Sequence, residues 1–252
     1  REIMAAVEVH DIVKSYRKGA VQALHGVSFE AGHGEIFGII GPDGAGKTSL
    51  FRILTTLILP DSGTASVDGL DIVRDYKAIR NCVGYMPGRF SLYQDMTVEE
   101  NLTFFATVFG TTIRENYHLI KDIYSQIEPF KDRKAGALSG GMKQKLALSC
   151  ALIHKPSVLF LDEPTIGLDA VSKIAVREFI REINRERGVT VILTTHDMSD
   201  IEALTERIML VGHGKVLLDG SLSELKSHYS SVRALTVEFS SGELPECEGL
   251  RL

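Results

Sequence analysis

One short glycine-rich segment constrains this chain more than any other part of its sequence. It matches the pattern G-x-x-x-x-G-K-[ST], in which successive backbone N–H groups curl around phosphate oxygens. The apolar residues 36–40 precede it as a buried strand, and residues 49–54 follow it as the start of a helix. A glycine-rich turn could match by chance, but the flanking strand and helix favour a phosphate-binding loop. The residues of the pattern are Gly41, Pro42, Asp43, Gly44, Ala45, Gly46, Lys47 and Thr48.

Two side chains of this loop have predicted roles in binding a nucleoside triphosphate. Lys47 would reach the β- and γ-phosphates, and the Thr48 hydroxyl would be a ligand of Mg²⁺. Ser49 continues the loop into the first turn of the helix, whose N-terminus favours anions. The segment therefore predicts a site for phosphates and a divalent cation.

The composition is that of an ordinary globular protein. Hydrophobic residues make up 44% of the 252 positions, which is enough for a full core. The net charge of −5 argues against a broad nucleic-acid surface. Cys82, Cys150 and Cys247 are too far apart for a disulfide framework, which favours a reducing compartment. No apolar run approaches the length of a membrane span, so we expect any membrane role to come through a partner.

Strand-like and helix-like segments alternate along the chain, and this order favours a parallel sheet with right-handed crossovers. The segments typical of strands are residues 7–13, 23–29, 36–40, 64–67, 158–161 and 189–193. The segments typical of helices are residues 97–109, 113–127, 139–153 and 176–183, with a further short helix opening at Ser221.

Two acidic residues follow the buried strand at 158–161. Asp162 lies at the end of this strand, where it suits the role of holding Mg²⁺ beside the phosphate loop. Glu163 comes next, where a carboxylate could polarise the attacking water. A strand that simply ends in solvated acids is common, but the phosphate loop favours the functional interpretation.

A second anion site is predicted at the start of the helix at 139–153. Ser139 is a good N-cap residue, and Gly140 and Gly141 expose backbone amides at the positive end of the helix. A capped helix alone would not favour two glycines in its first turn, because they lower helix stability. We therefore expect a group to approach this backbone closely.

Together these motifs resemble the nucleotide-binding domain of an ATP-binding-cassette (ABC) transporter. Residues 138–142 resemble the signature motif of the family, with Met142 where glutamine is commoner. Residues 165–169 resemble the D-loop, which ends at Asp169. The resemblance covers roughly residues 7–226.

The resemblance implies roles for two more residues. Residues 194–197 resemble the switch segment, in which His196 senses the γ-phosphate and acts with Glu163 in catalysis. Tyr16 ends the first strand, where the family stacks an aromatic ring on adenine, although tyrosine is also a plain strand former. The implied cofactors are ATP, bound by residues 41–49, and Mg²⁺.

The implied fold class is α/β: a P-loop NTPase core with a parallel sheet, an antiparallel β subdomain and an inserted helical lobe at about residues 85–154. The nucleotide-binding domain is expected at residues 1–226. Residues 227–252 look like the start of a C-terminal accessory segment, in which 232–239 alternate like a strand. Because the chain begins at Arg1 and not at Met, we expect it to be a piece of a longer product.

The family works as a sandwich dimer, in which ATP lies between the P-loop of one copy and the signature serine of the other. The resemblance therefore implies a second ABC cassette, either identical or fused or heterodimeric, and an integral membrane permease subunit. It implies a location on the cytoplasmic face of the inner membrane, with no nucleic-acid partner. Residues 91–102 and 214–221 resemble bacterial export ATPases of the drug, antibiotic and polysaccharide type, which favours export.

Two alternative functions stay open. A soluble ABC-type ATPase of translation or DNA maintenance would carry tandem cassettes, coiled-coil insertions or basic arms, none of which this sequence shows. A weakly hydrolysing regulatory cassette is suggested by Gly88, which follows Tyr85-Met86-Pro87 where the family usually has a glutamine that touches Mg²⁺ and the membrane partner. Gln94 is six positions further on and is expected to lie too far away to replace it.

Overall fold

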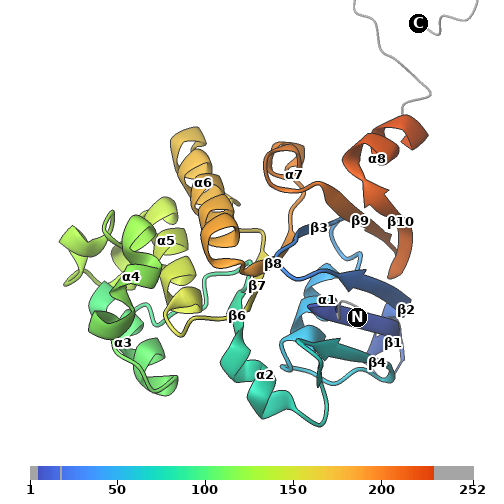
Figure 1. Ribbon diagram of the computed structural model, residues 1–252, viewed down its shortest axis with the longest axis horizontal. Coiled ribbons are helices and arrows are strands. Elements are labelled where there is room, and N and C mark those ends of the chain that lie inside the picture. Colours follow the sequence, from blue (N-terminus) through green and yellow to red (C-terminus); the bar gives the residue numbers. More distant parts are fainter. Residues whose placement is uncertain (1–4, 18, 230–252) are drawn as a thin grey trace, which may run out of the picture.

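The computed structural model describes residues 5–17 and 19–229. Its elements form two sheets and a group of helices (Figure 1). The strands are β1 (Val7–Tyr16), β2 (Val21–Ala31), β3 (Ile36–Ile40), β4 (Ser62–Val67), β5 (Leu70–Asp71), β6 (Val83–Met86), β7 (Val158–Asp162), β8 (Thr190–Thr194), β9 (Arg207–Gly212) and β10 (Lys215–Ser221). The helices are α1 (Lys47–Leu54), α2 (Tyr76–Cys82), α3 (Val98–Val108), α4 (Ile113–Tyr124), η1 (Glu128–Phe130), η2 (Ala135–Ala137), α5 (Gly140–Leu152), α6 (Ala170–Arg187), α7 (Met198–Leu204) and α8 (Leu222–Tyr229).

The central sheet has the strand order β10-β9-β3-β8-β7-β6. The pairs β9–β3, β3–β8, β8–β7 and β7–β6 are parallel, and β10 joins the edge antiparallel to β9. Every residue of β7 and β8 is buried, as expected for continuous apolar strands covered on both faces. Because these strands run in parallel, their carboxyl ends lie on the same side of the sheet, and the segments that follow β3, β7 and β8 leave the sheet there.

The second sheet is antiparallel, with the order β2-β1-β4-β5. Helix α1 packs between it and the central sheet, where the Phe51 ring meets the Phe160 ring of β7 edge-on at 5.3 Å between centroids. The rings of Phe29 in β2 and Phe37 in β3 stack at 5.4 Å. One hydrophobic core thus fixes the β subdomain against the helix that carries the phosphate loop.

Helices α3, α4 and α5 gather at the opposite end of the molecule from β1, β2 and β4, with the central sheet between them (Figure 1). The predicted capping box at Thr97 and Glu100 opens α3. A second capping box, at Thr112 and Glu115, opens α4. These helices lie within residues 98–152, and Tyr85 belongs to β6, which pairs with β7 in the central sheet.

The α/β fold class predicted from the sequence, a P-loop NTPase core with parallel and antiparallel sheets and an inserted helical lobe, is confirmed. Two short helices were not expected, α2 and α7, because each has seven residues and too few apolar positions to show a helical period. Helix α4 ends at Tyr124, three residues before the predicted end at Ile127, and a 3₁₀ turn follows. The strand predicted at 232–239 lies outside the described residues.

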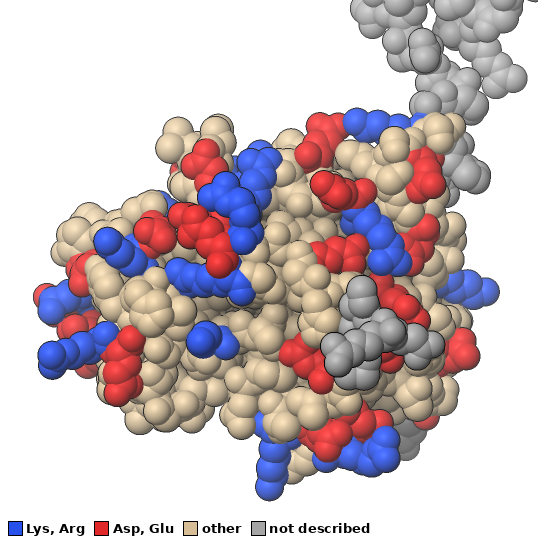
Figure 2. All heavy atoms as spheres, in the orientation of Figure 1, with Lys and Arg blue, Asp and Glu red and all other residues tan. Residues whose placement is uncertain are grey.

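Among the described residues, no helix combines the length and the apolar character that a bilayer crossing requires. On the face seen in Figure 2, lysine and arginine side chains are interspersed with acidic ones and form no continuous basic surface.

Candidate functional site

The phosphate loop connects β3 to α1 and depends on close backbone packing. A Cβ atom at Gly41 would lie 2.1 Å from the carbonyl oxygen of Val211, and one at Gly46 would lie 2.5 Å from that of Ala23. Gly46 also has φ of +106°, a conformation that side-chain-bearing residues rarely adopt. Only glycine fits at these two positions, so these glycines allow the loop to pack closely against the backbone of Val211 and Ala23.

Lys47 and Thr48 lie at the start of α1, inside this loop. The Lys47 ammonium donates hydrogen bonds to the carbonyl oxygens of Gly41 at 2.6 Å and Pro42 at 3.1 Å. Its side chain is therefore folded back across the loop, and the residue is only 8% exposed. Thr48 Oγ1 donates to Asp162 Oδ2 at 3.0 Å, which joins the phosphate loop to the end of β7.

Asp162 is held between two threonine hydroxyls. Its Oδ1 accepts a hydrogen bond from Thr194 Oγ1 at 2.6 Å, at the end of β8, while its Oδ2 accepts the bond from Thr48. The residue is 5% exposed. The carboxylate that was predicted to hold Mg²⁺ is thus fixed at the edge of the sheet with its oxygens beside the loop. Thr194, which the register places opposite Asp162, had no predicted role of its own.

Glu163 and His196 meet at the same edge of the sheet. Glu163 has φ of +55°, a strained backbone conformation for a residue with a side chain. Its N–H donates to the carbonyl oxygen and to Oγ1 of Thr194, each at 3.1 Å. Glu163 Oε1 lies 3.0 Å from Nδ1 of His196. The predicted base and the predicted γ-phosphate sensor are therefore in direct contact.

Tyr16 lies over the phosphate loop from β1. Its hydroxyl donates to Ser49 Oγ at 3.0 Å. A cavity of about 320 Å³ opens here. It is lined by Tyr16, Val21, Ala23, Asp43, Gly44, Ala45, Gly46, Lys47, Thr48, Ser49, Asp162 and Glu163. The structure thus gathers the predicted adenine, phosphate and metal ligands around one opening.

The signature segment lies elsewhere. The Ser139 side chain caps α5 by accepting the N–H of Met142 at 3.3 Å, and none of Ser139, Gly140 and Gly141 lines the cavity at the phosphate loop. A Cβ atom at Gly141 would lie 2.9 Å from Ser172 Oγ of α6, so this glycine allows the two helices to approach.

Asp169 caps the next helix, α6, by accepting the N–H of Ser172 at 2.9 Å. Its hydrogen bonds from Ser172 hold the pKa of the Asp169 carboxyl below its usual value. The D-loop aspartate is therefore a structural cap in this chain, and it joins the signature segment to the start of α6 through the shared contact at Ser172.

Gly88 lies against Asp162, the residue predicted to hold Mg²⁺. A Cβ atom at Gly88 would lie 3.2 Å from the carbonyl oxygen of Asp162. Gln94, the nearest glutamine in the sequence, instead accepts the N–H of Gly136 through its backbone carbonyl at 2.9 Å, in the helical lobe. It does not line the cavity at the phosphate loop.

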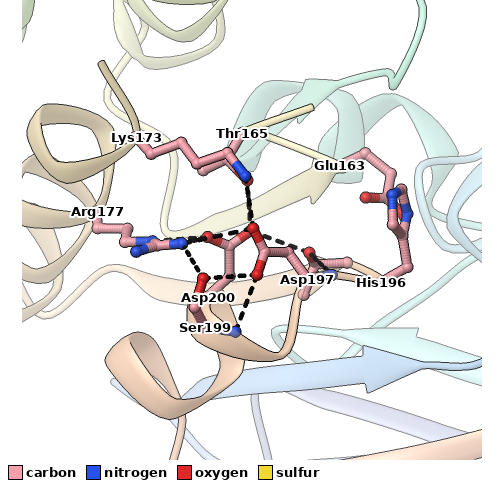
Figure 3. Close-up of polar contacts among 9 residues, drawn as sticks. Glu163, Thr165, Lys173, Arg177, His196, Asp197, Ser199 and Asp200 are labelled. Atoms are coloured by element: carbon pink, nitrogen blue, oxygen red, sulfur yellow. Dashed lines mark hydrogen bonds and ion pairs between the residues drawn. The ribbon is translucent and has the colours of Figure 1, made fainter. Parts of the chain in front are cut away.

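A second cavity brings the predicted D-loop and switch segments together with residues that had no predicted role, Lys173 and Met198. This cavity, of about 360 Å³, adjoins Glu163 and His196 on the side away from the phosphate loop. It is lined by Glu163, Thr165, Ile166, Gly167, Lys173, Thr195, His196, Asp197 and Met198. Figure 3 shows Lys173 and Arg177 extending from α6 toward Asp197 and Asp200 at the start of α7. The available signal was two cations one helical turn apart, which is ordinary on a solvated helix.

A phosphate loop follows β3 of a parallel sheet and leads into a helix, and a carboxylate lies beside the loop at the end of β7, which is separated from β3 by β8 alone. This arrangement defines a P-loop nucleoside triphosphatase. The model of the family described as ABC transporter matches residues 24–166. The chain belongs to this family, which confirms the resemblance seen in its motifs.

Curated relatives are ATP-binding proteins of transporters. The chain is 40% identical over 225 residues to the probable multidrug ABC transporter ATP-binding protein YbhF of Escherichia coli, covering 88% of this chain and 38% of that protein. It is 35% identical to the ABC transporter ATP-binding protein NatA of Bacillus subtilis, covering 86% of this chain and 88% of NatA. The chain thus spans less than half of YbhF but most of NatA.

Solved structures share the fold. A dimeric ATP-binding cassette in a post-hydrolysis state bound to ADP and Pi superimposes with a TM-score of 0.78 at 26% identity, covering 86% of this chain and 98% of that one. A bacterial Atm1-family ABC exporter with ATP bound superimposes with a TM-score of 0.78 at 27% identity, covering 89% of this chain and 40% of that one.

Proposed function

We propose that this chain binds and hydrolyses ATP and thereby powers export of a compound through a membrane permease. The observation that carries the proposal is the contact at 3.0 Å between Glu163 and His196, next to a phosphate loop whose Thr48 is hydrogen-bonded to Asp162. The proposed general base, its orienting partner and the phosphate loop thus lie together at the carboxyl ends of strands in a rigid sheet.

Each residue has a defined part in hydrolysis. The amides of the phosphate loop and the Lys47 ammonium bind the β- and γ-phosphates. Glu163 takes a proton from a water molecule while the oxygen of that water attacks the γ-phosphorus. The bond between the γ-phosphorus and the oxygen of the departing ADP breaks. His196 holds the Glu163 carboxylate in place through Nδ1.

The oxygen donors at the loop suit Mg²⁺, which prefers carboxylate, hydroxyl, phosphate and water oxygens. Thr48 Oγ1 and Asp162 Oδ2 lie 3.0 Å apart, so both can face one ion bound to the phosphates. Bound Mg²⁺ would offset phosphate charge in the transition state. The hydrogen bond from Thr194 keeps the Asp162 carboxylate oriented for this role.

A second cassette is expected to complete the site. Ser139, Gly140 and Gly141 offer a hydroxyl and a helix N-terminus for phosphate, yet they do not line the cavity at the phosphate loop. In a sandwich dimer the signature segment of one copy would face the phosphate loop of the other. The dimeric state of the related cassette bound to ADP and Pi supports this arrangement.

A hollow between the central sheet and the helical lobe suits the membrane partner. Its volume is about 810 Å³, and Pro87, directly before Gly88, lies in its lining. Leu57 and Val108, which are 55% and 60% exposed, contribute apolar surface. The basic residues Arg52, Lys77 and Arg80 also line it. We expect an amphipathic permease segment with an acidic residue to dock here, which would place the chain on the cytoplasmic face of the inner membrane.

Export is favoured over import by the names of relatives, which include a doxorubicin resistance protein of Mycobacterium tuberculosis and a Nod factor export protein of Rhizobium sp.. The transported compound is chosen by the permease, so no substrate is proposed.

ATP hydrolysis is tested directly with the purified chain. We expect Mg²⁺-dependent phosphate release that Lys47→Ala abolishes, since this change removes the ammonium from the loop. Hydrolysis at the same rate in Lys47→Ala, or none in the unaltered chain, would contradict the proposal.

The membrane partner is tested by capture from detergent-solubilised membranes of the source organism, with bound proteins identified by mass spectrometry. We expect a multi-spanning permease that Leu57→Glu releases. Leu217→Glu is the matched control, because Leu217 is similarly exposed at 57% but lies on β10, outside the hollow. Capture of ribosomal or DNA-bound proteins in place of a permease would favour the soluble ATPase alternative.

A further inference from the structure

A buried carboxylate lies behind the pair formed by Glu163 and His196. Asp200, in the first turn of α7, is 0% exposed. Its Oδ1 accepts a hydrogen bond from Arg177 Nε of α6 at 2.6 Å. Burying a charge costs free energy unless it is paired and hydrogen-bonded, and Asp200 meets both conditions.

The other oxygen of Asp200 joins two separate loops. Oδ2 accepts hydrogen bonds from the hydroxyls of Thr165 and Thr195, the latter at 3.0 Å. Thr165 lies two residues after Glu163, and Thr195 directly precedes His196. One carboxylate therefore connects the segment that follows Glu163 to the segment that precedes His196.

The same network fixes the backbone around His196. Thr195 Oγ1, which donates to Asp200, accepts the N–H of Asp197 at 3.0 Å. Asp197 in turn receives a hydrogen bond from Lys173 of α6 at 2.5 Å. The residues on both sides of His196 are thus held, while its own side chain is 59% exposed and has little packing to orient it.

No residue of this network lines the cavity at the phosphate loop. Its contacts run to the two loops that carry Glu163 and His196 and to α6, which begins at the D-loop residue Asp169. Because one carboxylate oxygen accepts from both loops, the position of Asp200 affects the loop of Glu163 and the loop of His196 together.

We propose that Asp200 and Arg177 are positioning residues that hold His196 against Glu163, and that they act on the rate of ATP hydrolysis and not on ATP binding. This inference rests on the proposed function of the chain as an ATPase. A displacement of about 1 Å between reacting groups can lower a rate substantially, so a small shift of His196 is sufficient to reduce the rate of hydrolysis.

Steady-state kinetics of ATP hydrolysis separate the rate of hydrolysis, measured as kcat, from ATP binding, measured through KM. Asp200→Asn keeps the shape but puts an amide N–H₂ where one of the oxygens accepts, so the three donors cannot all be satisfied. We expect kcat to fall by about tenfold, with KM for ATP within about twofold of its original value. Arg177→Met should act similarly, and Arg177→Lys should recover part of the rate because it keeps the charge without the fork.

The matched control is Arg181→Met. Arg181 lies one turn further along α6 and also bridges to α7, through a hydrogen bond from Nε to the carbonyl oxygen of Ala203 at 2.8 Å. It touches neither Thr165 nor Thr195. Should Arg181→Met lower kcat as much as Arg177→Met, the effect would be loss of helix packing, and the proposal would be overturned.

A second variant avoids disturbing the buried charge. Thr165→Val removes one hydroxyl and leaves the pair of Asp200 and Arg177 intact, so it should fold even where Asp200→Asn does not. We expect a kcat several-fold lower with KM for ATP unchanged. An unchanged kcat in folded Thr165→Val would overturn the proposal.

Imidazole NMR signals provide a readout that does not depend on hydrolysis. We assign the His196 signals by their absence in His196→Gln. They should shift in Asp200→Asn and Thr165→Val but not in Arg181→Met. Unshifted signals in the first two variants would overturn the positioning role, whereas an unaltered chain without ATPase activity would contradict the proposed function and leave this spectral test valid.

Discussion

Nδ1 of His196 lies 3.0 Å from Oε1 of Glu163, although 33 positions separate the two residues in the sequence. The parallel register of β7 and β8 brings them together, because Asp162 pairs with Thr194 at the ends of these strands. The backbone N–H of Glu163 donates to Thr194, so the strand that leads to His196 also holds Glu163 in its left-handed conformation. The sheet therefore brings the backbones of the two residues close together.

The ring of Tyr16 is predicted to stack on adenine. Base–aromatic stacking contributes about 1 kcal/mol or more, which corresponds to roughly fivefold or more in affinity. Tyr16→Ala should raise KM for ATP by about this factor, whereas Tyr16→Phe keeps the ring and loses only the hydrogen bond to Ser49. Parallel KM measurements check this. Equal increases in both variants would assign the effect to the hydroxyl and contradict stacking.

Mixed dimers test whether Ser139 acts across the interface. Lys47→Ala disables one phosphate loop, and Ser139→Arg blocks one signature segment. If each site combines the loop of one copy with the serine of the other, a mixed dimer has one doubly altered site and one intact site. We expect each variant alone to be inactive and the mixture to regain part of the activity. Proven mixed dimers without any recovery would show that each copy completes its own site.

Gly88, in place of the glutamine that is usual in the family, is predicted to weaken Mg²⁺ binding without abolishing catalysis. The structure adds a constraint, because a Cβ atom there would crowd the Asp162 carbonyl oxygen at 3.2 Å. Gly88→Ala introduces this crowding alone, and Gly88→Gln adds an oxygen that can bind the metal. Relative to Gly88→Ala, Gly88→Gln should lower the Mg²⁺ concentration for half-maximal hydrolysis about fivefold, from about 1 kcal/mol for one polar contact. Superimposable Mg²⁺ titrations of the two variants would remove the metal argument.

His154 makes the stability of the fold depend on pH. Its ring stacks on Phe109 at 3.9 Å, Nε2 donates to the Val83 carbonyl oxygen at 3.0 Å, and Nδ1 is buried without a partner. Burial lowers the pKa of His154 below 6.5 in the folded protein. The unfolded chain, with a His pKa near 6.5, therefore binds a proton more readily, and the free energy of unfolding falls as pH drops below about 6.5.

Urea unfolding at pH 7.5 and pH 5.5 measures this dependence. His154→Phe keeps the stacking on Phe109 and removes the titrating group, so it should lose less stability than the unaltered protein between the two pH values. His118→Gln, at an exposed position, is the control and should behave like the unaltered protein. Equal losses in all three proteins would contradict a role for the buried imidazole.

The phosphate loop and the acids at 162–163 were predictable because their chemistry requires fixed residue types at fixed spacings next to a strand. The capping box at Thr97 is similarly local, and α3 begins where it predicts. The family, the fold class and these elements follow from short-range patterns that one sequence displays.

The network around Asp200 was not predictable in the same way. Arg177, Thr165 and Thr195 meet this carboxylate from three different segments, and only the packing of α6 on α7 brings them together. Thr165 and Thr195 belong to segments that resemble family motifs, but nothing in the spacing of these residues indicates a shared contact. The exclusion of Gln94 from the site likewise depends on the tertiary position of the helical lobe.

The most direct test of the proposed mechanism is the hydrolysis rate and oligomeric state of Glu163→Gln. This change removes the proposed base but leaves Lys47, Thr48 and Asp162 in place. We expect kcat to fall by about 100-fold or more while ATP still binds, with an ATP-dependent dimer accumulating in light scattering after size exclusion. Turnover equal to that of the unaltered chain, with no dimer on ATP addition, would contradict both the role of Glu163 and the ATP-driven closure of two cassettes.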